Sequence, residues 1–191
     1  MENPAAPPGK TYRYARPERE RRFLLAEVPK GWVGRRTQII DRYITGTQFR
    51  LRRTTETAGS RTEIYHKLTQ KIASPIGGPG IINTLYIDRH EYAVFEALPA
   101  MTLSKVRLSI PPFGVDTFSG ELTGLVLAEI EFETDEAMHE FHAPFFSVAE
   151  VTKDNRFTGG FLCTASRSDL LAALEEFGLG EQGPSATAPG E

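Results

Sequence analysis

The feature that most constrains the fold of this chain is a set of five short segments in which charged residues occupy every second position. Alternate residues of a β-strand lie on the same face of a sheet. Each segment therefore predicts a strand with one charged face, which three of the five back with apolar residues. Two segments supply carboxylates and three supply cations. The five segments are Glu18–Arg22, Arg50–Arg52, Lys67–Lys71, Lys105–Arg107 and Glu129–Glu133.

These charged faces can be satisfied in two ways. In an open sheet they face water. In a closed sheet wrapped by helices they face inward and form a charged tunnel, which suits a divalent metal held by carboxylates and a polyanion held by cations. Because an uncompensated buried ion costs several kcal/mol, such a tunnel needs charges of both signs. The candidate cations are Arg22, Arg50, Arg52, Lys67, Lys71, Lys105 and Arg107, and the candidate carboxylates are Glu18, Glu20, Glu129, Glu131 and Glu133.

The bulk composition restricts the class of protein. The chain has 191 residues, of which 40% are hydrophobic and 25% are charged, as expected for one soluble globular domain. Its formal net charge of -3 gives no general attraction to nucleic acid or to an anionic membrane, so any affinity for phosphate must be local. No apolar run approaches the roughly 20 residues that cross a bilayer. We therefore expect neither a nucleic-acid partner nor a membrane.

The cysteine content and the first residues bear on the compartment. The single cysteine, Cys163, excludes an internal disulfide framework and fits a reducing environment. The residues Met1–Pro4 have neither a basic segment nor an apolar core, so we expect no signal peptide. These features predict a cytoplasmic protein, either a monomer or a homodimer.

Composition along the chain predicts one folded unit with two unstructured ends. Residues 1–11 and 178–191 are rich in Pro, Ala and Gly, which predicts a flexible start and a disordered tail around a single domain at 12–177.

Strand-length segments dominate the predicted domain. Capped starts and helical spacing predict helices only within 88–98, 134–144 and 168–177. The fold class is therefore α+β with mainly antiparallel strands, and closure into a barrel is a plausible way to remove the exposed edges. The predicted strands lie near 17–26, 37–45, 48–55, 63–72, 82–88, 104–111, 113–119 and 125–133.

Seven short motifs follow one another between about residue 17 and residue 163. Each is weak alone, but their order resembles that of the CYTH domain, also called the triphosphate tunnel metalloenzyme family. The motifs are Glu18, Glu20 and Arg22; Arg50 and Arg52; Leu68-Thr69-Gln70-Lys71; Lys105 and Arg107; Asp116-Thr117-Phe118-Ser119-Gly120; Gly124, Leu125, Ala128, Glu129 and Glu131; and Glu150, Val151, Thr152, Asp154 and Arg156.

The resemblance implies a closed eight-stranded antiparallel β-barrel with flanking helices, forming a tunnel in which triphosphate compounds are hydrolysed or cyclised with Mg²⁺ or Mn²⁺. It implies that Tyr43 is a candidate proton acceptor, although a tyrosine packed at a strand end fits that position equally well, and that Arg22 assists. It also implies a metal site at Glu18, Glu20, Glu129 and Glu131, and phosphate binding by Arg50, Arg52, Lys67, Lys71, Lys105, Arg107 and Arg156.

Two positions depart from the family pattern. Arg22 replaces a lysine, and an arginine keeps its charge but does not readily lose a proton. The segment Ile82–Ile87 lacks the acidic pair that many members carry on this strand. Metal binding or water activation could therefore be weakened.

These observations favour metal-dependent hydrolysis of inorganic triphosphate or of a small organic triphosphate. Two alternatives remain open. The same tunnel could act as a class IV-type adenylate cyclase, or it could bind polyphosphate or nucleotide without catalysis. The missing acidic pair favours the non-catalytic binder. The expected partner in each case is a small molecule that contains a triphosphate.

Overall fold

The computed structural model of the protein describes residues 15–31, 34–72 and 80–180. The predicted flexible segment 1–11 and most of the predicted tail 178–191 lie outside these residues. Within them the chain forms ten strands. They are β1 (Arg16–Pro17), β2 (Glu20–Leu25), β3 (Arg36–Ile44), β4 (Phe49–Ala58), β5 (Arg61–Ile72), β6 (Ile81–Ile87), β7 (Ala100–Ile110), β8 (Phe113–Phe118), β9 (Val126–Glu131) and β10 (Ala149–Glu150).

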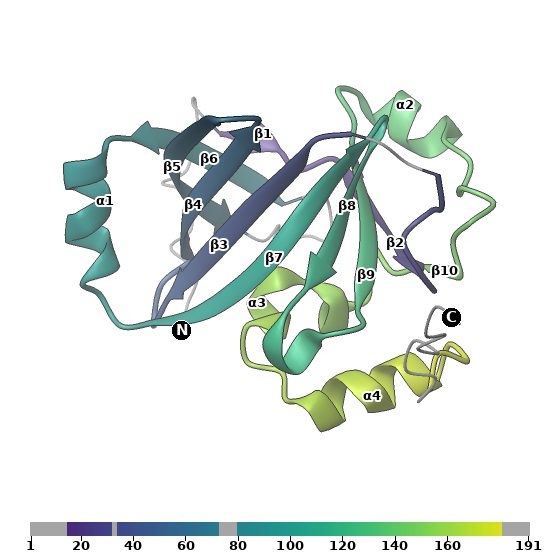
Figure 1. Ribbon diagram of the computed structural model, residues 1–191. Coiled ribbons are helices and arrows are strands. Elements are labelled where there is room, and N and C mark those ends of the chain that lie inside the picture. Colours follow the sequence, from purple (N-terminus) through teal and green to yellow (C-terminus); the bar gives the residue numbers. More distant parts are fainter. Residues whose placement is uncertain (1–14, 32–33, 73–79, 181–191) are drawn as a thin grey trace, which may run out of the picture.

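All ten strands belong to one antiparallel sheet (Figure 1). Their order across the sheet is β1-β6-β5-β4-β3-β7-β8-β9-β2-β10. The predicted dominance of antiparallel strands is confirmed.

The prediction of a closed eight-stranded barrel is wrong. Within the described residues β1 and β10 are the two edges of an open sheet, and no ladder joins them. The cause lies in the first predicted strand, 17–26, which the structure divides in two. β1 pairs with β6, whereas β2 pairs with β9 and β10 at the other end of the sheet. Pro17 ends β1 because proline has no backbone N–H to continue a ladder.

The short link between β1 and β2 nevertheless forces the sheet to curl. Pro17 and Glu20 are three Cα steps apart, a distance of at most about 11 Å. The backbone N–H of Glu18 donates to the carbonyl of Gly80 beside β6 at 2.7 Å, and the carbonyl of Arg19 accepts from Phe132 beyond β9 at 2.8 Å. This link therefore draws opposite ends of the sheet together without closing the ladder.

Helices are few, as the sequence predicts. α1 (Arg89–Glu96) and α2 (Asp135–Glu140) fall within predicted helical regions, and α4 (Arg167–Glu175) begins one residue before the third. The sequence did not predict the four-residue helix α3 (Gly159–Leu162). Two 3-10 turns complete the described structure, η1 (Gly120–Leu122) and η2 (Asn155–Phe157).

Capping side chains explain where the longer helices begin. The Asp88 carboxylate accepts backbone hydrogen bonds at the start of α1, and the Glu91 carboxylate accepts one from the backbone N–H of Asp88. Ser166 and Asp169 make the same reciprocal pair at the start of α4. Such capping boxes satisfy N–H groups that have no partner within the helix.

β2 shows how alternation divides the sheet into two environments. Phe23 and Leu25 are buried on one face, in an apolar cluster with Val115, Ala128 and other side chains. The other face carries Glu20 and Arg22, which line a cavity. Leu24 follows Glu20 and Arg22 on this second face. It is buried in a separate apolar cluster, to which α4 contributes Leu170, Ala173 and Leu174.

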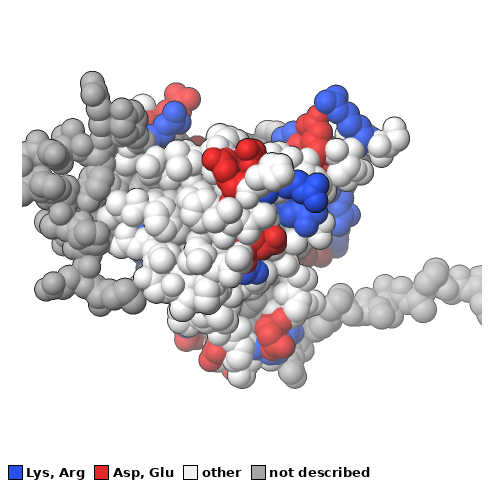
Figure 2. Space-filling model, turned by 90° about the vertical axis from the view of Figure 1, so that its left-hand side faces the viewer, with Lys and Arg blue, Asp and Glu red and all other residues white. Residues whose placement is uncertain are grey.

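On the face shown in Figure 2, the outer surface has no large patch of a single sign of charge. There the basic and acidic side chains occur in small mixed groups. In the described part of the chain, no helix has the length and apolar character needed to cross a membrane.

The buried apolar face of β2 should dominate stability. Phe23 is fully buried, whereas Phe145 is 99% exposed. We expect Phe23→Ala to lower the free energy of unfolding by about 3–5 kcal/mol, because it removes a large buried side chain and leaves a cavity. Phe145→Ala is the matched control and should cause little change. Urea denaturation measures both, and equal effects of the two substitutions would contradict this packing.

Candidate functional site

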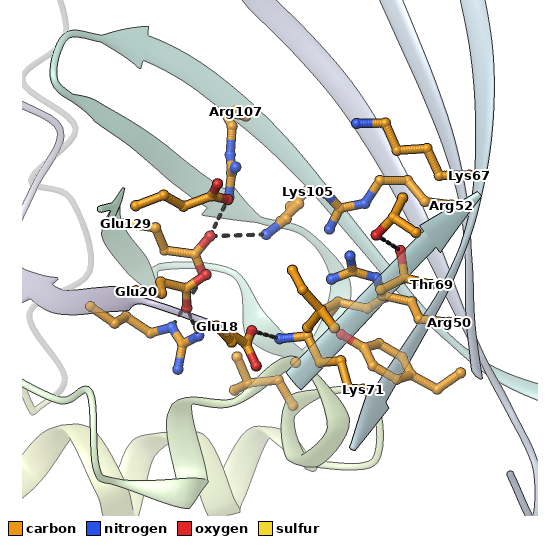
Figure 3. A pocket seen from close by; sticks show the side chains of 18 of the residues that line it. Glu18, Glu20, Arg50, Arg52, Lys67, Thr69, Lys71, Lys105, Arg107 and Glu129 are labelled. Atoms are coloured by element: carbon orange, nitrogen blue, oxygen red, sulfur yellow. Dashed lines mark hydrogen bonds and ion pairs between the residues drawn. The ribbon is translucent and has the colours of Figure 1, made fainter. Parts of the chain in front are cut away.

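The inner face of the curled sheet holds a cavity of about 430 Å³, seen from close by in Figure 3. Residues of nine strands, β1 to β9, and of the η2 and α3 region surround it. Its lining residues are Arg16, Glu18, Glu20, Arg22, Tyr43, Arg50, Arg52, Lys67, Thr69, Lys71, Ile82, Thr84, Tyr86, Leu103, Lys105, Arg107, Phe118, Leu127, Glu129, Glu131, Phe157, Gly159 and Leu162.

The structure brings together all the predicted metal, phosphate and catalytic residues except Arg156, and Glu133, also a candidate cavity carboxylate, is exposed and does not line the cavity. The alternating charged faces therefore converge on one cavity, although the sheet around it is open. The predicted site residues that line it are Glu18, Glu20, Arg22, Tyr43, Arg50, Arg52, Lys67, Lys71, Lys105, Arg107, Glu129 and Glu131.

Arg156 lies outside the cavity, at the end of η2. Its guanidinium donates to Asp154 at 2.8 Å and to Glu176 at 2.7 and 2.8 Å. These bonds to Asp154 and Glu176 raise the pKa of Arg156. In this arrangement Arg156 ties η2 to the end of α4 and is not directed at the cavity.

Asp41 on β3 fixes the arginines of β4. Arg52 lies directly opposite Asp41 in the ladder and donates two hydrogen bonds to its carboxylate, at 2.6 and 2.7 Å. The Nε atom of Arg50 lies 3.7 Å from the same carboxylate. Burial alone would raise the pKa of Asp41, but the charge and hydrogen bonds of Arg52 lower it. Asp41 is thus an ionised carboxylate buried beneath two arginines.

Asp116 on β8 does the same for the cations of β7. It is completely buried and lies opposite Arg107 in the ladder. Lys105 approaches its carboxylate at 2.5 Å, and Arg107 donates two hydrogen bonds of 2.7 Å. Neither Asp41 nor Asp116 was predicted to have a role in the site. Each is the one aspartate in the interior of a strand that otherwise carries several apolar residues, and this is a signal that could have identified both.

The carboxylates at the β2 and β9 wall are also paired. Glu129 accepts hydrogen bonds from Arg107 and from Arg22, whose Nε atom lies 3.1 Å away, and Lys105 lies at 3.9 Å. Arg22 also contacts Glu20. The Arg22 guanidinium therefore bridges two carboxylates from neighbouring strands. At the entrance, Lys71 pairs with Glu18.

Glu20 and Glu129 differ in how well their charges are compensated. Burial raises the pKa of Glu20, and the nearby charge of Glu129 raises it further, to about 7 against the favourable effects of Arg22 and Lys71. Burial would also raise the pKa of Glu129, but Lys105, Arg107 and Arg22 together hold it well below its ordinary value. The wall thus has one firmly ionised carboxylate beside one that takes a proton easily.

Arg50 and Lys67 donate no hydrogen bond to a carboxylate among the described residues, although Arg50 lies 3.7 Å from Asp41. The Nε atom of Arg50 is buried and has no hydrogen-bond partner there. The Nζ atom of Lys67 lies 4.8 Å from the centre of the Tyr86 ring and 5.6 Å from that of Tyr65, and it makes no ion pair with any described residue. Buried donors without partners are costly, so Arg50 is well suited to receive an anionic ligand.

Tyr43 reaches the base of the cavity and packs against α3. A Cβ atom at Gly159 would lie 1.9 Å from the Tyr43 hydroxyl, so only glycine fits there. Burial raises the pKa of Tyr43 to about 12, and the charge of Asp41 adds to this effect. In the ligand-free protein Tyr43 is therefore protonated and is better placed to donate a hydrogen bond than to accept a proton.

The acidic residues do not form a ready-made metal cage. Among the described residues, no group of three or more His, Cys, Asp or Glu side chains is arranged to hold a metal ion. Magnesium, however, is commonly bound by one or two carboxylates together with waters and substrate phosphates. The buried pair Glu20 and Glu129 fits that mode, because its two charges repel and Glu20 is incompletely compensated.

Comparison with solved structures finds proteins of similar fold. NE1496 aligns with a TM-score of 0.50 and 26% sequence identity, over 78% of this chain and 99% of its own. A second structure of NE1496, described there as an inorganic triphosphatase, aligns with a TM-score of 0.49 and 25% identity, over 78% of this chain and 95% of its own. PH1819 from Pyrococcus horikoshii OT3 aligns with a TM-score of 0.44 and 14% identity, over 64% of this chain and 82% of its own.

No protein-family model and no curated protein matches the sequence. The likeness to NE1496 extends along almost all of that protein, so this chain shares its fold over most of its own length.

The buried aspartates should be essential to the folded state. Asp116→Asn removes the charge that holds Lys105 and Arg107 and leaves buried cations uncompensated. We expect it to lower the free energy of unfolding by about 3–5 kcal/mol. Glu63→Gln is the control, since Glu63 pairs with Arg61 on the exposed surface and should have little effect. Urea denaturation at neutral pH checks this, and a stable Asp116→Asn protein would contradict it.

Glu20 should make the stability of the metal-free protein depend on pH. Its pKa of about 7 in the folded protein exceeds its ordinary value of 4.5, so the folded state binds more protons between these two values. The contribution of Glu20 to the free energy of unfolding therefore falls as pH rises across this range. Glu20→Gln should remove that fall.

Urea denaturation in EDTA at pH 5 and pH 8 measures the difference between wild type and Glu20→Gln. The variant should gain stability relative to wild type at pH 8 compared with pH 5. A difference that is the same at both pH values would show that the folded protein does not raise the pKa of Glu20.

Proposed function

We propose that this protein belongs to the CYTH family and hydrolyses a triphosphate compound in the charged cavity with the help of Mg²⁺ or Mn²⁺. The observation that carries the proposal is the convergence of cations from five strands on one cavity, with buried aspartates holding several of them in place. The fold shared with NE1496, which is described as an inorganic triphosphatase, supports the same conclusion.

The cavity can hold a polyanion without large rearrangement. Arg52, Lys105 and Arg107 are fixed by carboxylates behind them, so their remaining donors can point to a ligand. Arg50 and Lys67 add positive charge that no described carboxylate neutralises by a hydrogen bond. Donors that are already oriented stabilise the charge that develops on phosphoryl oxygens and need no reorganisation during the reaction.

A divalent metal would be held by Glu20 and Glu129 together with phosphate oxygens. When bound, it would neutralise charge on the phosphoryl group and activate the attacking water. Because Arg22 already contacts both carboxylates, its guanidinium would have to share them with the metal or move toward the phosphates. Arg22 keeps its charge in either position, so it can assist phosphate binding but not proton transfer. Tyr43, being protonated, would donate a hydrogen bond at the base of the cavity.

Hydrolysis of a triphosphate requires little covalent chemistry from the protein. Water attacks the terminal phosphorus in line with the leaving phosphate, and negative charge spreads over the equatorial oxygens. The β4 cations and the β7 cations face this space from opposite sides of β3, which is the order in which the strands lie. This geometry suits a phosphate chain held between them.

A specific observation favours one alternative, a protein that binds triphosphates without hydrolysing them. Arg22 already bridges Glu20 and Glu129, and the described residues offer no cluster of three metal ligands. If Arg22 permanently takes the place of a metal, the cavity would bind the anion and leave it intact.

Phosphate release from tripolyphosphate with Mg²⁺, with Mn²⁺ and with EDTA tests the proposal. We expect turnover only with metal, and a loss of about 100- to 1000-fold in kcat for Arg50→Ala, which removes a preorganised donor. Arg53→Ala is the control, since Arg53 lies on the same strand but does not line the cavity.

One further result would decide against hydrolysis, and another against the proposed metal site. Tight binding of tripolyphosphate without phosphate release under any metal would select the binding protein. Unchanged activity in the double variant Glu20→Gln, Glu129→Gln would show that these carboxylates do not hold the metal.

A further inference from the structure

One wall of the cavity differs in kind from the rest. β6 presents Ile82, Thr84 and Tyr86 to the cavity, and none of them is charged. Thr84 shares a hydrogen bond of 3.1 Å with Thr69, so its hydroxyl already has a partner. Phosphate oxygens placed against this wall would lose water and find few donors in return, which is unfavourable.

Tyr86 makes this wall suitable for a flat apolar group. It lines the cavity and yet is 73% exposed, so much of its ring is open to solvent. The ring is also held in place, because the ammonium of Lys67 lies 4.8 Å from its centre. An exposed and oriented aromatic ring at the side of a cavity is the kind of surface on which another aromatic ring stacks.

The register of the strands places this ring at a defined distance from the phosphate-binding cations. Arg52 lies directly opposite Lys67, and Lys67 lies directly opposite Tyr86. Neighbouring strands are about 4.8 Å apart, so the backbone of Tyr86 lies about 10 Å from that of Arg52. A phosphate chain held by Arg52 and Lys67 would therefore extend toward Tyr86 at one end.

We propose that the β6 wall, with Tyr86 as its main contact, binds a planar aromatic base attached to the triphosphate, so that the preferred ligand is a nucleoside triphosphate and not inorganic triphosphate. This inference rests on the proposed function in that it uses the same phosphate-binding cations. It goes further by assigning a specificity site on a strand that contributes no charge.

Equilibrium binding separates the two claims. We expect wild-type protein, measured by calorimetry with Mg²⁺ and the analogue β,γ-methylene-ATP, whose terminal phosphate cannot be released, to bind the nucleotide more tightly than tripolyphosphate. Tyr86→Ala should weaken nucleotide binding by about 10- to 100-fold, the effect typical of losing one base–aromatic stack, and should leave tripolyphosphate binding unchanged. Tyr86→Phe should retain nucleotide binding because it keeps the ring.

Leu85→Ala provides the matched control. Leu85 is the neighbouring residue on β6, is 54% exposed and does not line the cavity, so its loss should affect neither ligand.

Each remaining result has a clear meaning. Tighter binding of tripolyphosphate than of nucleotide, or equal effects of Tyr86→Ala on both ligands, would overturn the inference and leave triphosphate hydrolysis standing. Nucleotide binding that depends on Tyr86 without phosphate release from ATP would support the inference and refute hydrolysis. No binding of either ligand would overturn both.

Discussion

The cavity depends on two carboxylates that are buried beneath its cations, Asp41 and Asp116. Each is buried and holds a pair of cations from a neighbouring strand. Without them the cations of β4 and β7 would repel one another in a space that excludes much of the water, and the sheet could not keep them together. With them the cations have fixed positions and spare donors. The ability to bind a polyanion therefore depends on the two buried aspartates that hold these cations in place.

The placement of the ligand-facing residues could be predicted from the sequence because it follows from alternation alone. Glu20 and Arg22 share one face of β2, so the strand geometry places Phe23 on the other face. Burial of Phe23 in the apolar core then turns the charged face of β2 toward the cavity. The same rule placed the charged residues of β4, β5, β7 and β9. It could not place Arg156, which lies after the last cavity strand in a turn whose side-chain direction no simple period determines.

The closure of the sheet and the supporting carboxylates could not be predicted in the same way. Closure depends on whether one ladder continues through Pro17, and a charged pattern that spans 17–26 does not show that the strand divides there. The support depends on register, which decides that Asp41 meets Arg52 and Asp116 meets Arg107. Register results from pairing between strands that are distant in the sequence. The sequence therefore predicts which strand faces are charged, but not which charged residues lie opposite one another.

The order of the strands also gives the cavity a direction. Across the sheet the inner face is neutral on β6, cationic on β5, β4 and β7, and rich in carboxylates on β9 and β2. A ligand that carries charge at one end and an apolar group at the other can satisfy all these walls in only one orientation. Its phosphates would reach toward Glu20 and Glu129, and its uncharged group would lie on β6. Inorganic triphosphate has no such asymmetry, and it would leave the β6 wall without a partner.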